Sequence, residues 1–424
     1  MNIVASKYND EKHKSCQSFI NYSRGWIKTS KRSQMKPKIP KRFKLVSYNI
    51  LADGEKLALG SKHDYCPLNL RQWKLRFSKI KAELCSYNAD IVCLQEILPT
   101  AFKSDFLPYF ESSGFVGLYF RDTKSSKSVS IATATFIKTS SFKILDKKSV
   151  YFSSCVEPAV HTGKLKKKLL SLSEGVLMTL LQRRESENVV LVMNTHIHWD
   201  PSYPNIKAQQ CAFACKAAKL FLKSACKPLN INEDVVPIVF AGDFNSIRDV
   251  QLAFLPSIQK QWYKHDDELN ALGGAYQLLS TGYLHQSHPE HPDSFAKSLP
   301  PVITKTECKT STGKKMKIKN ARKFVGRLET KIDFNHVYEE IKIPFTTKVP
   351  DFQGPIDYIF FTSSKLHCIA YLEMPYSALD AVDTHKNVNF ASENKPTPSE
   401  FPYIPNERWP SDHLAIGGIF EFRS

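Results

Sequence analysis

The octet Val239-Phe240-Ala241-Gly242-Asp243-Phe244-Asn245-Ser246 is the stretch around which the rest of the chain is interpreted. The apolar run at 236–240 ends at an Ala-Gly pair, which predicts a buried strand that closes into a tight turn. Asp243 and Asn245 lie two residues apart, so period-two geometry would send a carboxylate and a carboxamide to the same side. By itself the octet fits a plain turn equally well, and its meaning depends on the other segments.

Several other apolar runs of the sequence also finish on, or next to, polar side chains. Strands are predicted at 43–49, 89–96, 131–137, 143–152, 188–196, 352–361 and 414–422. Strand ends in a layered sheet are where sites form. We therefore expect one site built from the polar residues at these ends, namely Asn49, Glu96, His196, Asp243, Asn245, Asp357, Asp412 and His413.

Two helices are predicted between these strands. The first begins at Pro67, and its apolar stripe has Arg and Lys on the opposite face. The second covers about 206–224. Polar or basic loops are expected at 125–130 and 161–168. The stripe consists of Leu70, Trp73, Phe77, Ile80 and Leu84.

Composition favours an anionic partner. The 424 residues include 59 Lys and Arg against 41 Asp and Glu, a formal charge of +18. Nucleic acid is the first candidate and a membrane surface the second, while an inert basic surface remains an alternative. No run of 18 or more apolar residues occurs, so no membrane span is expected.

The ten cysteines show no Cys-x-x-Cys spacing. They are typical of reduced thiols in an intracellular protein rather than of a disulfide framework or a zinc site. Cys211 and Cys215 lie four residues apart on a predicted helix. Core packing is favoured over metal binding for this pair, because two further ligands are lacking nearby.

We expect residues 1–42 to form a basic, disordered arm, with a mitochondrial transit segment as the weaker alternative. Residues 43–424 are then expected to form a single catalytic domain. A basic insertion at about 257–335 is predicted to consist mostly of loops with some helix.

The residue types at the strand ends fit together chemically. Glu and Asp provide hard oxygen ligands for Mg²⁺, or alternatively Mn²⁺. Asn and His can donate to phosphate oxygens or stabilise a developing charge. A zinc hydrolase is disfavoured because it would need several His or Cys ligands together, and His196-x-His198 is the only pair of histidines two residues apart; neither a Gly-x-Ser-x-Gly motif nor a P-loop occurs. The set therefore indicates metal-assisted hydrolysis of a phosphate ester.

At these residues the sequence resembles the endonuclease/exonuclease/phosphatase superfamily. The resemblance implies an α/β fold in which a two-layer β-sandwich is flanked by helices, giving four layers. It extends in family order from about residue 43 to the C-terminus. The matching runs are Ser-Tyr-Asn-Ile-Leu-Ala (47–52), Leu-Gln-Glu (94–96), Asn-Thr-His (194–196), Gly-Asp-Phe-Asn-Ser (242–246), Ile-Asp-Tyr-Ile-Phe (356–360) and Pro-Ser-Asp-His (410–413).

Within the superfamily the chain is most similar to the carbon-catabolite-repressor-type deadenylases and their relatives nocturnin and Angel. Three further motifs carry this resemblance, and the first two point more to the deadenylases than to nocturnin. They are Tyr65-Cys66-Pro67 with Arg71 and Trp73, His196-Ile197-His198-Trp199-Asp200-Pro201, and Asp351-Phe352-x-Gly354.

The resemblance implies a role for each site residue. Glu96 would bind magnesium beside Asn49, Asp243 would activate or orient water, and Asn245 would hold the phosphate. His196 would stabilise the transition state, and Asp357 would orient His413. The implied metal and phosphate ligands are Glu96, Asp243, Asn245, Asp412 and His413, and the implied substrate contacts are Pro201 and Phe352, which grip the terminal adenine, with His198.

The function implied is a Mg²⁺-dependent 3′-to-5′ exoribonuclease that prefers poly(A) 3′ ends and releases nucleoside 5′-monophosphates. One alternative is a phosphatase for a nucleotide 2′-phosphate or a cyclic RNA end, and another is a non-catalytic RNA-binding module. No leucine-rich repeats precede the predicted domain, so docking through such repeats is not expected. We expect a monomer in the cytoplasm or nucleus, with the mitochondrion as an alternative.

Overall fold

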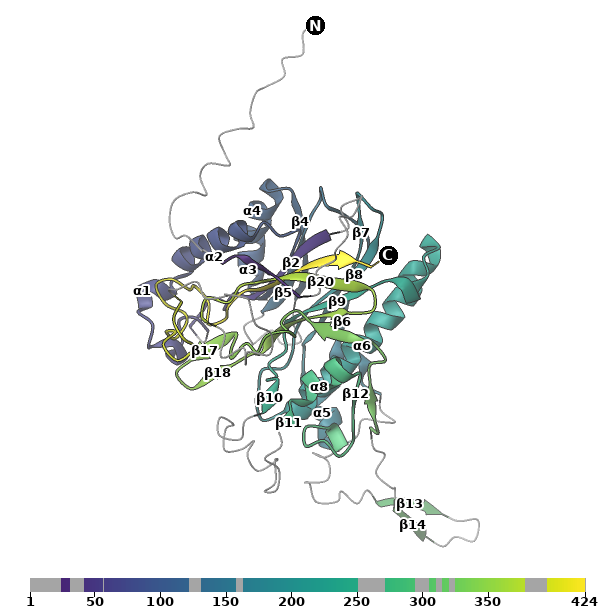
Figure 1. The fold of residues 1–424 in the computed structure, drawn as a ribbon. Coiled ribbons are helices and arrows are strands. Elements are labelled where there is room, and N and C mark those ends of the chain that lie inside the picture. The colour runs from purple at the N-terminus through teal and green to yellow at the C-terminus, as the bar shows by residue number, and fades with distance from the viewer. Residues whose placement is uncertain are drawn as a thin grey trace.

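The computed structural model describes residues 24–30, 42–55, 57–121, 131–157, 163–250, 271–293, 305–309, 315–319, 325–377 and 395–423. Two β-sheets face each other in the middle of the molecule, and helices cover both outer faces (Figure 1). The predicted α/β sandwich with four layers is therefore confirmed.

The first sheet has seven strands, in which β2 and β3 are parallel and all other neighbours are antiparallel. Its N-terminal strand is unexpected, because residues 24–30 were placed in the disordered arm. The order across the sheet is β1 (Trp26–Lys28), β20 (Leu366–Leu372), β21 (Ile416–Phe422), β2 (Arg42–Asn49), β3 (Ile91–Ile97), β5 (Ala132–Lys138) and β4 (Phe115–Arg121).

The second sheet has six strands, and only β8 and β9 are parallel. Every residue of β9 is buried, because the first sheet covers one face of the strand and a helix covers the other. The edge strand β6 instead exposes several charged side chains. The order is β16 (Phe334–His336), β19 (Asp357–Thr362), β9 (Ile238–Asp243), β8 (Val189–His196), β7 (Gly175–Arg183) and β6 (Phe142–Tyr151).

Three apolar clusters hold the layers together. One lies between the sheets, where Leu45 and Ile91 meet Val190 and Val239. The second joins the first sheet to α2 (Trp73–Tyr87) and α4 (Leu107–Ser112), and the third joins the second sheet to α6 (Pro204–Cys226) and α8 (Gly274–Thr281). The other helices in the described part of the chain are α1 (Leu68–Arg71), α3 (Pro99–Ala101) and α5 (Gly163–Ser171), with a π-helical turn at Phe102–Phe106 and 3₁₀ turns at Ser61–His63, Phe152–Cys155, Lys227–Leu229 and Glu233–Val235.

Four two-stranded ribbons complete the described part of the chain. Three of them lie in or next to the expected insertion, and the fourth flanks the closing strands. They are β10 (Asp249–Val250) with β11 (Ala271–Leu272), β12 (Tyr283–Leu284) with β15 (Leu328–Glu329), β13 (Lys305–Lys309) with β14 (Lys315–Lys319), and β17 (Thr347–Val349) with β18 (Phe352–Gly354).

The expectation of a disordered arm is wrong for residues 24–30. Strand β1 pairs with β20, and the Arg24 side chain enters the core. Its Nη2 donates to the carbonyl of Ala415 at 2.6 Å, and its Nη1 donates to Tyr87 Oη at 3.1 Å. A basic residue can therefore anchor this segment, although composition suggested only a solvated arm.

The single helix predicted from Pro67 is also wrong. The chain is extended at Gln72 (ψ 132°), which ends α1 and begins α2. Arg76 lies on the buried side of α2, where its guanidinium donates to the carbonyls of Ile50, Leu51 and Arg71. These bonds to a neighbouring loop keep Arg76 inside, whereas the helical pattern placed the Arg and Lys residues opposite the apolar stripe.

Other predicted boundaries change in similar ways. Residues 163–168 were expected to be a loop and begin helix α5. The strand predicted at 352–361 is interrupted after Gly354, because Pro355 lacks the N–H that a continuous ladder requires. The loop predicted at 125–130 lies outside the described residues.

Part of the expected insertion belongs to the core. Helix α8 packs on α6 with Leu278 and Leu279 fully buried, and Leu284 is buried beside them. Cys211 and Cys215 of α6 are buried in the same cluster, which confirms core packing for that pair. Among the described residues, no helix combines the length and apolar character needed to cross a membrane.

Candidate active site

The parallel strands β8 and β9 place His196 directly beside Asp243. A close approach of the two backbones makes this pairing possible, since Gly242 has φ +152° and an added Cβ would lie 2.1 Å from the carbonyl oxygen of Thr195. Only glycine fits such a position. His196 Nε2 consequently lies 3.5 Å from Asp243 Oδ2.

Asn245 reaches the site by a different geometry from the one predicted. Strand β9 ends at Asp243, and Asn245 has a left-handed backbone (φ 47°), so the period-two argument does not apply. Its backbone N–H donates to Asp243 Oδ1 at 2.8 Å, and its Nδ2 donates to the carbonyl of Ile197 at 3.0 Å. Asn245 therefore closes a turn around the carboxylate of Asp243.

Glu96 lies in a bulge and not at the end of its strand. The pairing of β3 with β5 shifts register between Leu94 and Ile97, and Glu96 has φ +56°. Bulges redirect single side chains, and a strained backbone is common at functional sites. The Glu96 carboxylate accepts from the backbone N–H of Ala52 at 3.2 Å and is thereby turned towards the loop that follows β2.

Asn49 connects the two sheets at this point. Its fully buried Nδ2 donates to Glu96 Oε1 at 3.1 Å and to Asp243 Oδ2 at 2.9 Å. Its Oδ1 accepts from the N–H of Leu51 at 3.1 Å, and Ser411 donates to its carbonyl at 2.7 Å. Three of these bonds fix the side-chain amide so that one NH₂ group faces both carboxylates, and the bond from Ser411 holds the Asn49 backbone.

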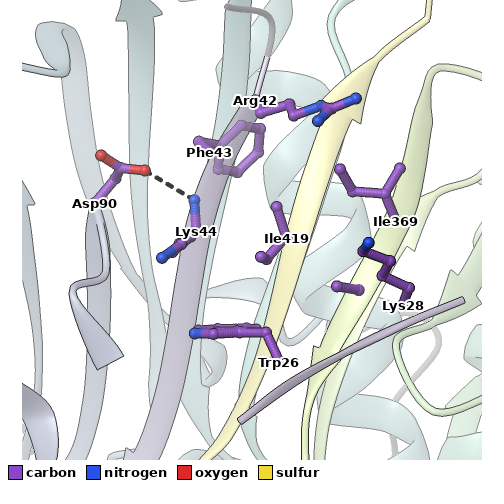
Figure 2. Close-up of a pocket in the computed structure, with 9 residues that line it drawn as sticks. Trp26, Lys28, Arg42, Phe43, Lys44, Asp90, Ile369 and Ile419 are labelled. Carbon is purple, nitrogen blue, oxygen red and sulfur yellow. Dashed lines mark hydrogen bonds between the residues drawn. The ribbon is translucent and has the colours of Figure 1, made fainter. Parts of the chain in front are cut away.

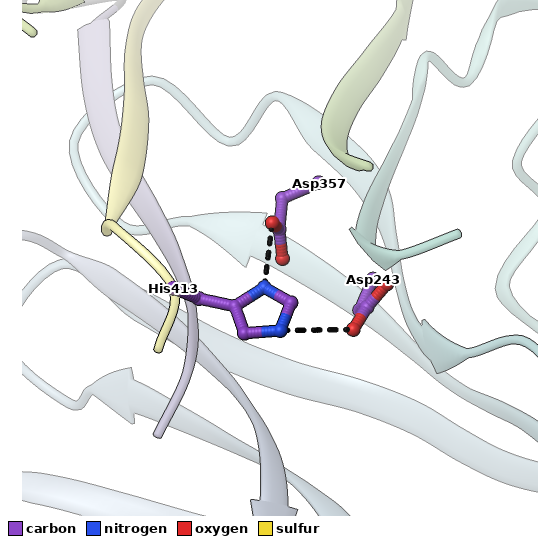
Figure 3. A group of neighbouring side chains, drawn as sticks. All are labelled: Asp243, Asp357 and His413. Atoms are coloured by element: carbon purple, nitrogen blue, oxygen red, sulfur yellow. Dashed lines mark hydrogen bonds and ion pairs between the residues drawn. The ribbon is translucent and has the colours of Figure 1, made fainter. Parts of the chain in front are cut away.

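Asp357 and His413 complete the centre from the other side, as Figure 3 shows. His413 Nδ1 lies 2.8 Å from Asp357 Oδ2, and its Nε2 points at Asp243 Oδ2, 3.7 Å away. Thr346 also donates to Asp357 Oδ2, at 2.5 Å. Burial opposes a charge on the imidazole, but Asp357 and Asp243 outweigh burial and raise the pKa of His413 well above its ordinary value. The protonated ring is therefore the favoured form.

Asp412 faces a histidine that the sequence did not single out. His63 Nε2 lies 3.2 Å from Asp412 Oδ2, and His63 Nδ1 lies 3.2 Å from the carbonyl of Leu57. Burial raises the pKa of Asp412, but contacts with His63 and His413 outweigh burial and lower it. His63 occupies a short turn within a polar stretch, so no periodic signal marked it.

The donor set suits a divalent cation. Glu96 and Asp243 offer oxygen atoms on either side of the same amide, and buried carboxylates need a compensating positive charge. Ligand atoms of Asp243, Asp357 and His413 also lie within 4.8 Å of one another. His413 could contribute only Nε2, because its Nδ1 contacts Asp357. The predicted ligand set of Glu96, Asp243, Asn245, Asp412 and His413 stays a prediction.

His198, a predicted substrate contact, is a buried residue held by neighbouring side chains. It is 4% exposed, and its Nδ1 lies 2.7 Å from Glu174 Oε1. Gln210 of α6 accepts from the His198 backbone N–H and donates to Glu174 Oε2. This network fixes the His198 ring beside Glu174, and its role as a substrate contact stays a prediction.

Pro201 and Phe352 come from separate segments. Pro201 lies in the loop between β8 and α6, and Phe352 lies on β18 with 37% of its surface exposed. The neighbouring β17 contacts the site directly, since Thr347 pairs with His413. Their grip on an adenine stays a prediction.

Lys207 is a second residue that the sequence did not single out. It is 5% exposed on α6, and its Nζ donates to the carbonyl of Asn245 at 2.6 Å. Burial lowers its pKa to about 8, although Glu290, Asp243 and Asp200 act in the opposite direction. Lys207 is one of four lysines on α6, so no sequence signal distinguished it from the others.

A groove away from these residues lies on the first sheet. A groove of about 460 Å³ crosses the first sheet between β1 and β2, and Trp26, Lys28, Arg42 and Lys44 line it (Figure 2). The Lys44 backbone N–H donates to Asp90 at 2.8 Å at its side. None of the predicted site residues lines this groove, so the centre at the strand ends is the candidate active site.

Comparisons with known proteins agree with the fold. The sequence model described as "Endonuclease/Exonuclease/phosphatase family" matches residues 46–413. The "CCR4-Not complex 3'-5'-exoribonuclease subunit Ccr4" of Candida albicans is 26% identical over 404 residues, covering 92% of this chain and 42% of that protein. The "CCR4-NOT transcription complex subunit 6-like-A" of Xenopus laevis is 24% identical over 417 residues, covering 93% and 66%. The chain thus spans only part of the length of these relatives.

Two solved structures share the architecture. The first is ANGEL2, described as a 2′,3′-cyclic phosphatase in complex with adenosine-2′,3′-vanadate, at a TM-score of 0.63 and 21% identity over 96% of this chain and 99% of that one. The second is the human Nocturnin catalytic domain with bound sulfate, at a TM-score of 0.53 and 16% identity over 95% and 98%. At these identities the likeness shows the fold alone.

Proposed function

Because the chain belongs to the endonuclease/exonuclease/phosphatase family, we propose that it is a metal-dependent 3′-to-5′ exoribonuclease that shortens poly(A) and releases 5′-AMP. The relatives named above as 3′-5′ exoribonuclease subunits support this choice of reaction. The formal charge of +18 suits a polyanionic substrate.

One observation carries the proposal. Asn49 Nδ2 donates to both Glu96 and Asp243, while His196 Nε2 and His413 Nε2 lie within 4 Å of the same Asp243 oxygen. Acidic oxygens and imidazoles within one small volume are the groups required to cleave a phosphodiester by attack of water.

Glu96 and Asp243 are the residues that would hold the divalent ion, with Mg²⁺ as the first choice and Mn²⁺ as an alternative. When bound, such an ion polarises the phosphate and makes water more acidic. Asn49 keeps the two carboxylates apart and oriented. Asp412 extends the acidic set towards His63.

The side chains around the ion would carry out the other steps of the hydrolysis. Asp243 orients the attacking water and can take up its proton, since Oδ1 is fixed by the Asn245 N–H. His196 and protonated His413 direct Nε2 towards the oxygen of Asp243, where a phosphate would acquire negative charge. Asp357 holds the imidazole of His413 in place, and the Asn245 side chain contacts the phosphate.

The test compares the wild-type protein with Glu96→Gln on three substrates in Mg²⁺. These are an RNA with an oligo(A) tail, an RNA ending in a 2′,3′-cyclic phosphate, and a dinucleotide carrying a 2′-phosphate. We expect 5′-AMP to appear from the oligo(A) 3′ end, and Glu96→Gln to lower kcat by about 10³-fold, equivalent to about 4 kcal/mol. The exposed Glu111→Gln is the matched control and should behave as wild type.

Each other outcome has a clear meaning. If the 2′-phosphate or the cyclic end is consumed while oligo(A) stays intact, the protein is a phosphatase and the proposed exoribonuclease activity is wrong. RNA binding without turnover of any substrate would identify a non-catalytic binding module. Full activity of Glu96→Gln would remove Glu96 from the metal site.

A further inference from the structure

Trp199 is an exposed tryptophan next to the candidate active site. It lies three residues after His196, in the loop between β8 and α6, and 62% of its surface is exposed. Tryptophan normally buries most of its large ring, and an exposed indole beside a site is typical of a binding surface. Its neighbour His198 is buried and paired with Glu174, so the base of the loop is fixed beneath the exposed ring.

Lys62 covers the ring from a different part of the chain. Its Nζ lies 5.4 Å from the Trp199 ring centroid. Lys62 directly precedes His63, which contacts Asp412, whereas Trp199 follows His196, which contacts Asp243. The two loops come from different sheets, so the Lys62–Trp199 pair spans the two halves of the site.

A second exposed aromatic side chain, Tyr403, lies against Tyr65 of the same loop. The ring centroid of Tyr65 lies 6.0 Å from that of His63 and 5.8 Å from that of Tyr403. Tyr65 donates to the carbonyl of Ile404, which ties the loop to the segment that carries Tyr403. Tyr403 itself is 45% exposed.

Together these contacts connect two exposed aromatic rings to the loop at 61–65, since Lys62 contacts Trp199 and Tyr65 contacts Tyr403. Proteins that bind single-stranded nucleic acid combine aromatic stacking platforms with positive charge along the backbone path. Aromatic rings that only stabilise the core are buried, and a surface that binds RNA by charge alone contains no exposed rings. The exposed rings therefore indicate stacking with bases.

We infer that Trp199, Lys62 and Tyr403 form an extended subsite for single-stranded RNA. Bases preceding the terminal nucleotide stack on Trp199 and Tyr403, and the Lys62 ammonium contacts a backbone phosphate between them. The inference rests on the proposed exoribonuclease function, and it concerns residues other than the Pro201 and Phe352 assigned to the terminal adenine.

The experiment measures kcat and KM of the full chain on an adenosine dinucleotide and on a 12-nucleotide oligo(A). Trp199→Ala and Tyr403→Ala should each lower the ratio of kcat/KM for the long over the short substrate by about tenfold, mostly through KM. Trp199→Phe should restore most of the ratio, because phenylalanine still stacks. Thermal melting of each variant checks that the fold is intact.

Tyr283→Ala is the matched control. Tyr283 is 41% exposed and has the Arg327 guanidinium 4.6 Å from its ring, so it presents the same pair of chemical groups. It follows α8, at the end of the helix away from Ser246, and should leave the ratio unchanged.

Binding of a fluorescent 12-nucleotide oligo(A) by the same variants separates this inference from the proposed function. Weaker binding by Trp199→Ala and Tyr403→Ala supports the subsite even if no RNA is hydrolysed, in which case the exoribonuclease proposal fails alone. An unchanged ratio together with unchanged binding would overturn the subsite, whatever the activity.

Discussion

Asn49 on β2 donates a 2.9 Å hydrogen bond from Nδ2 to Oδ2 of Asp243 on β9, and this bond connects the two sheets at the candidate active site. The other hydrogen of the same NH₂ group serves Glu96 at 3.1 Å. An amide nitrogen has two hydrogens, so both are in use. Position 49 therefore requires an uncharged side chain that donates two hydrogen bonds, one to each carboxylate.

Asn49→Asp tests that requirement. The change replaces the donor by a third carboxylate, which should repel both Glu96 and Asp243 and displace them from their working positions. We expect kcat to fall by about 10²- to 10³-fold and the melting temperature at neutral pH to decrease. Initial rates on oligo(A) RNA and thermal melting measure both effects.

The control for that substitution is Asn69→Asp, which makes the same chemical change at an exposed position of α1. Its rates and melting temperature should match the wild type. If Asn49→Asp kept full activity, the double hydrogen bond would have no part in catalysis.

Gly242→Ala should destabilise the fold strongly. Its Cβ would lie 2.1 Å from the Thr195 carbonyl oxygen and would add strain at φ +152°, so β9 could not keep its register with β8. The expected cost is about 3 kcal/mol or more, measured by urea unfolding. Gly114→Ala is the comparison, because its φ of +79° is also positive but no atom lies within 4 Å. It should cost about 1 kcal/mol, and equal losses for the two variants would refute the close-approach argument.

Phe352→Ala should reduce the preference for adenine. Stacking of a base on an aromatic ring contributes about 1 to 3 kcal/mol, so trimming of poly(A) should slow by about 5- to 150-fold. Other homopolymers should slow much less. Parallel time courses on poly(A), poly(U) and poly(C) measure the difference, and an equal loss on all three would count against the adenine grip.

His336 should make the fold sensitive to acid. Burial among aromatic rings, with Arg248 acting in the same direction, lowers the pKa of His336 from 6.5 to about 4. The unfolded chain therefore binds the proton first. The stabilisation is complete above about pH 6.5 and is lost as the pH falls towards 4, by about 3 kcal/mol over the full window.

His336→Phe tests this directly, because phenylalanine keeps the ring packing and removes the titrating group. The difference in unfolding free energy between pH 7 and pH 4.5 should shrink by about 2 to 3 kcal/mol relative to wild type. The exposed His285→Phe should leave the difference unchanged. An acid sensitivity that is identical in all three proteins would exclude His336 as its source.

The strands and the chemistry of the site were largely accessible from the sequence. Apolar runs marked β2, β8 and β9, and Asn49, His196 and Asp243 stand at their ends as expected. Such runs are visible because a strand covered on both faces must be apolar along its whole length. Metal-ligand chemistry is likewise a property of residue type.

The sequence did not predict the positions of residues whose hydrogen-bond partners lie far away along the chain. Arg24 and Arg76 carry charges, and the sequence placed them in solvent, yet backbone carbonyls from remote loops accept their hydrogen bonds inside the protein. His63 and Lys207 likewise obtain their place from contacts with Asp412 and Asn245, far along the chain. The residues next to each of these side chains in the sequence do not indicate such distant partners.

The sequence by itself determined the family of fold and the set of groups at the centre, since both follow from short-range patterns in the chain. The tertiary structure decided how the set is assembled. It placed Glu96 in a bulge, turned Asn245 through a left-handed residue, and set Asn49 between two sheets. The reason is physical: hydrogen bonds and close backbone contacts between segments distant in sequence fix these positions, and no periodicity along one segment encodes them.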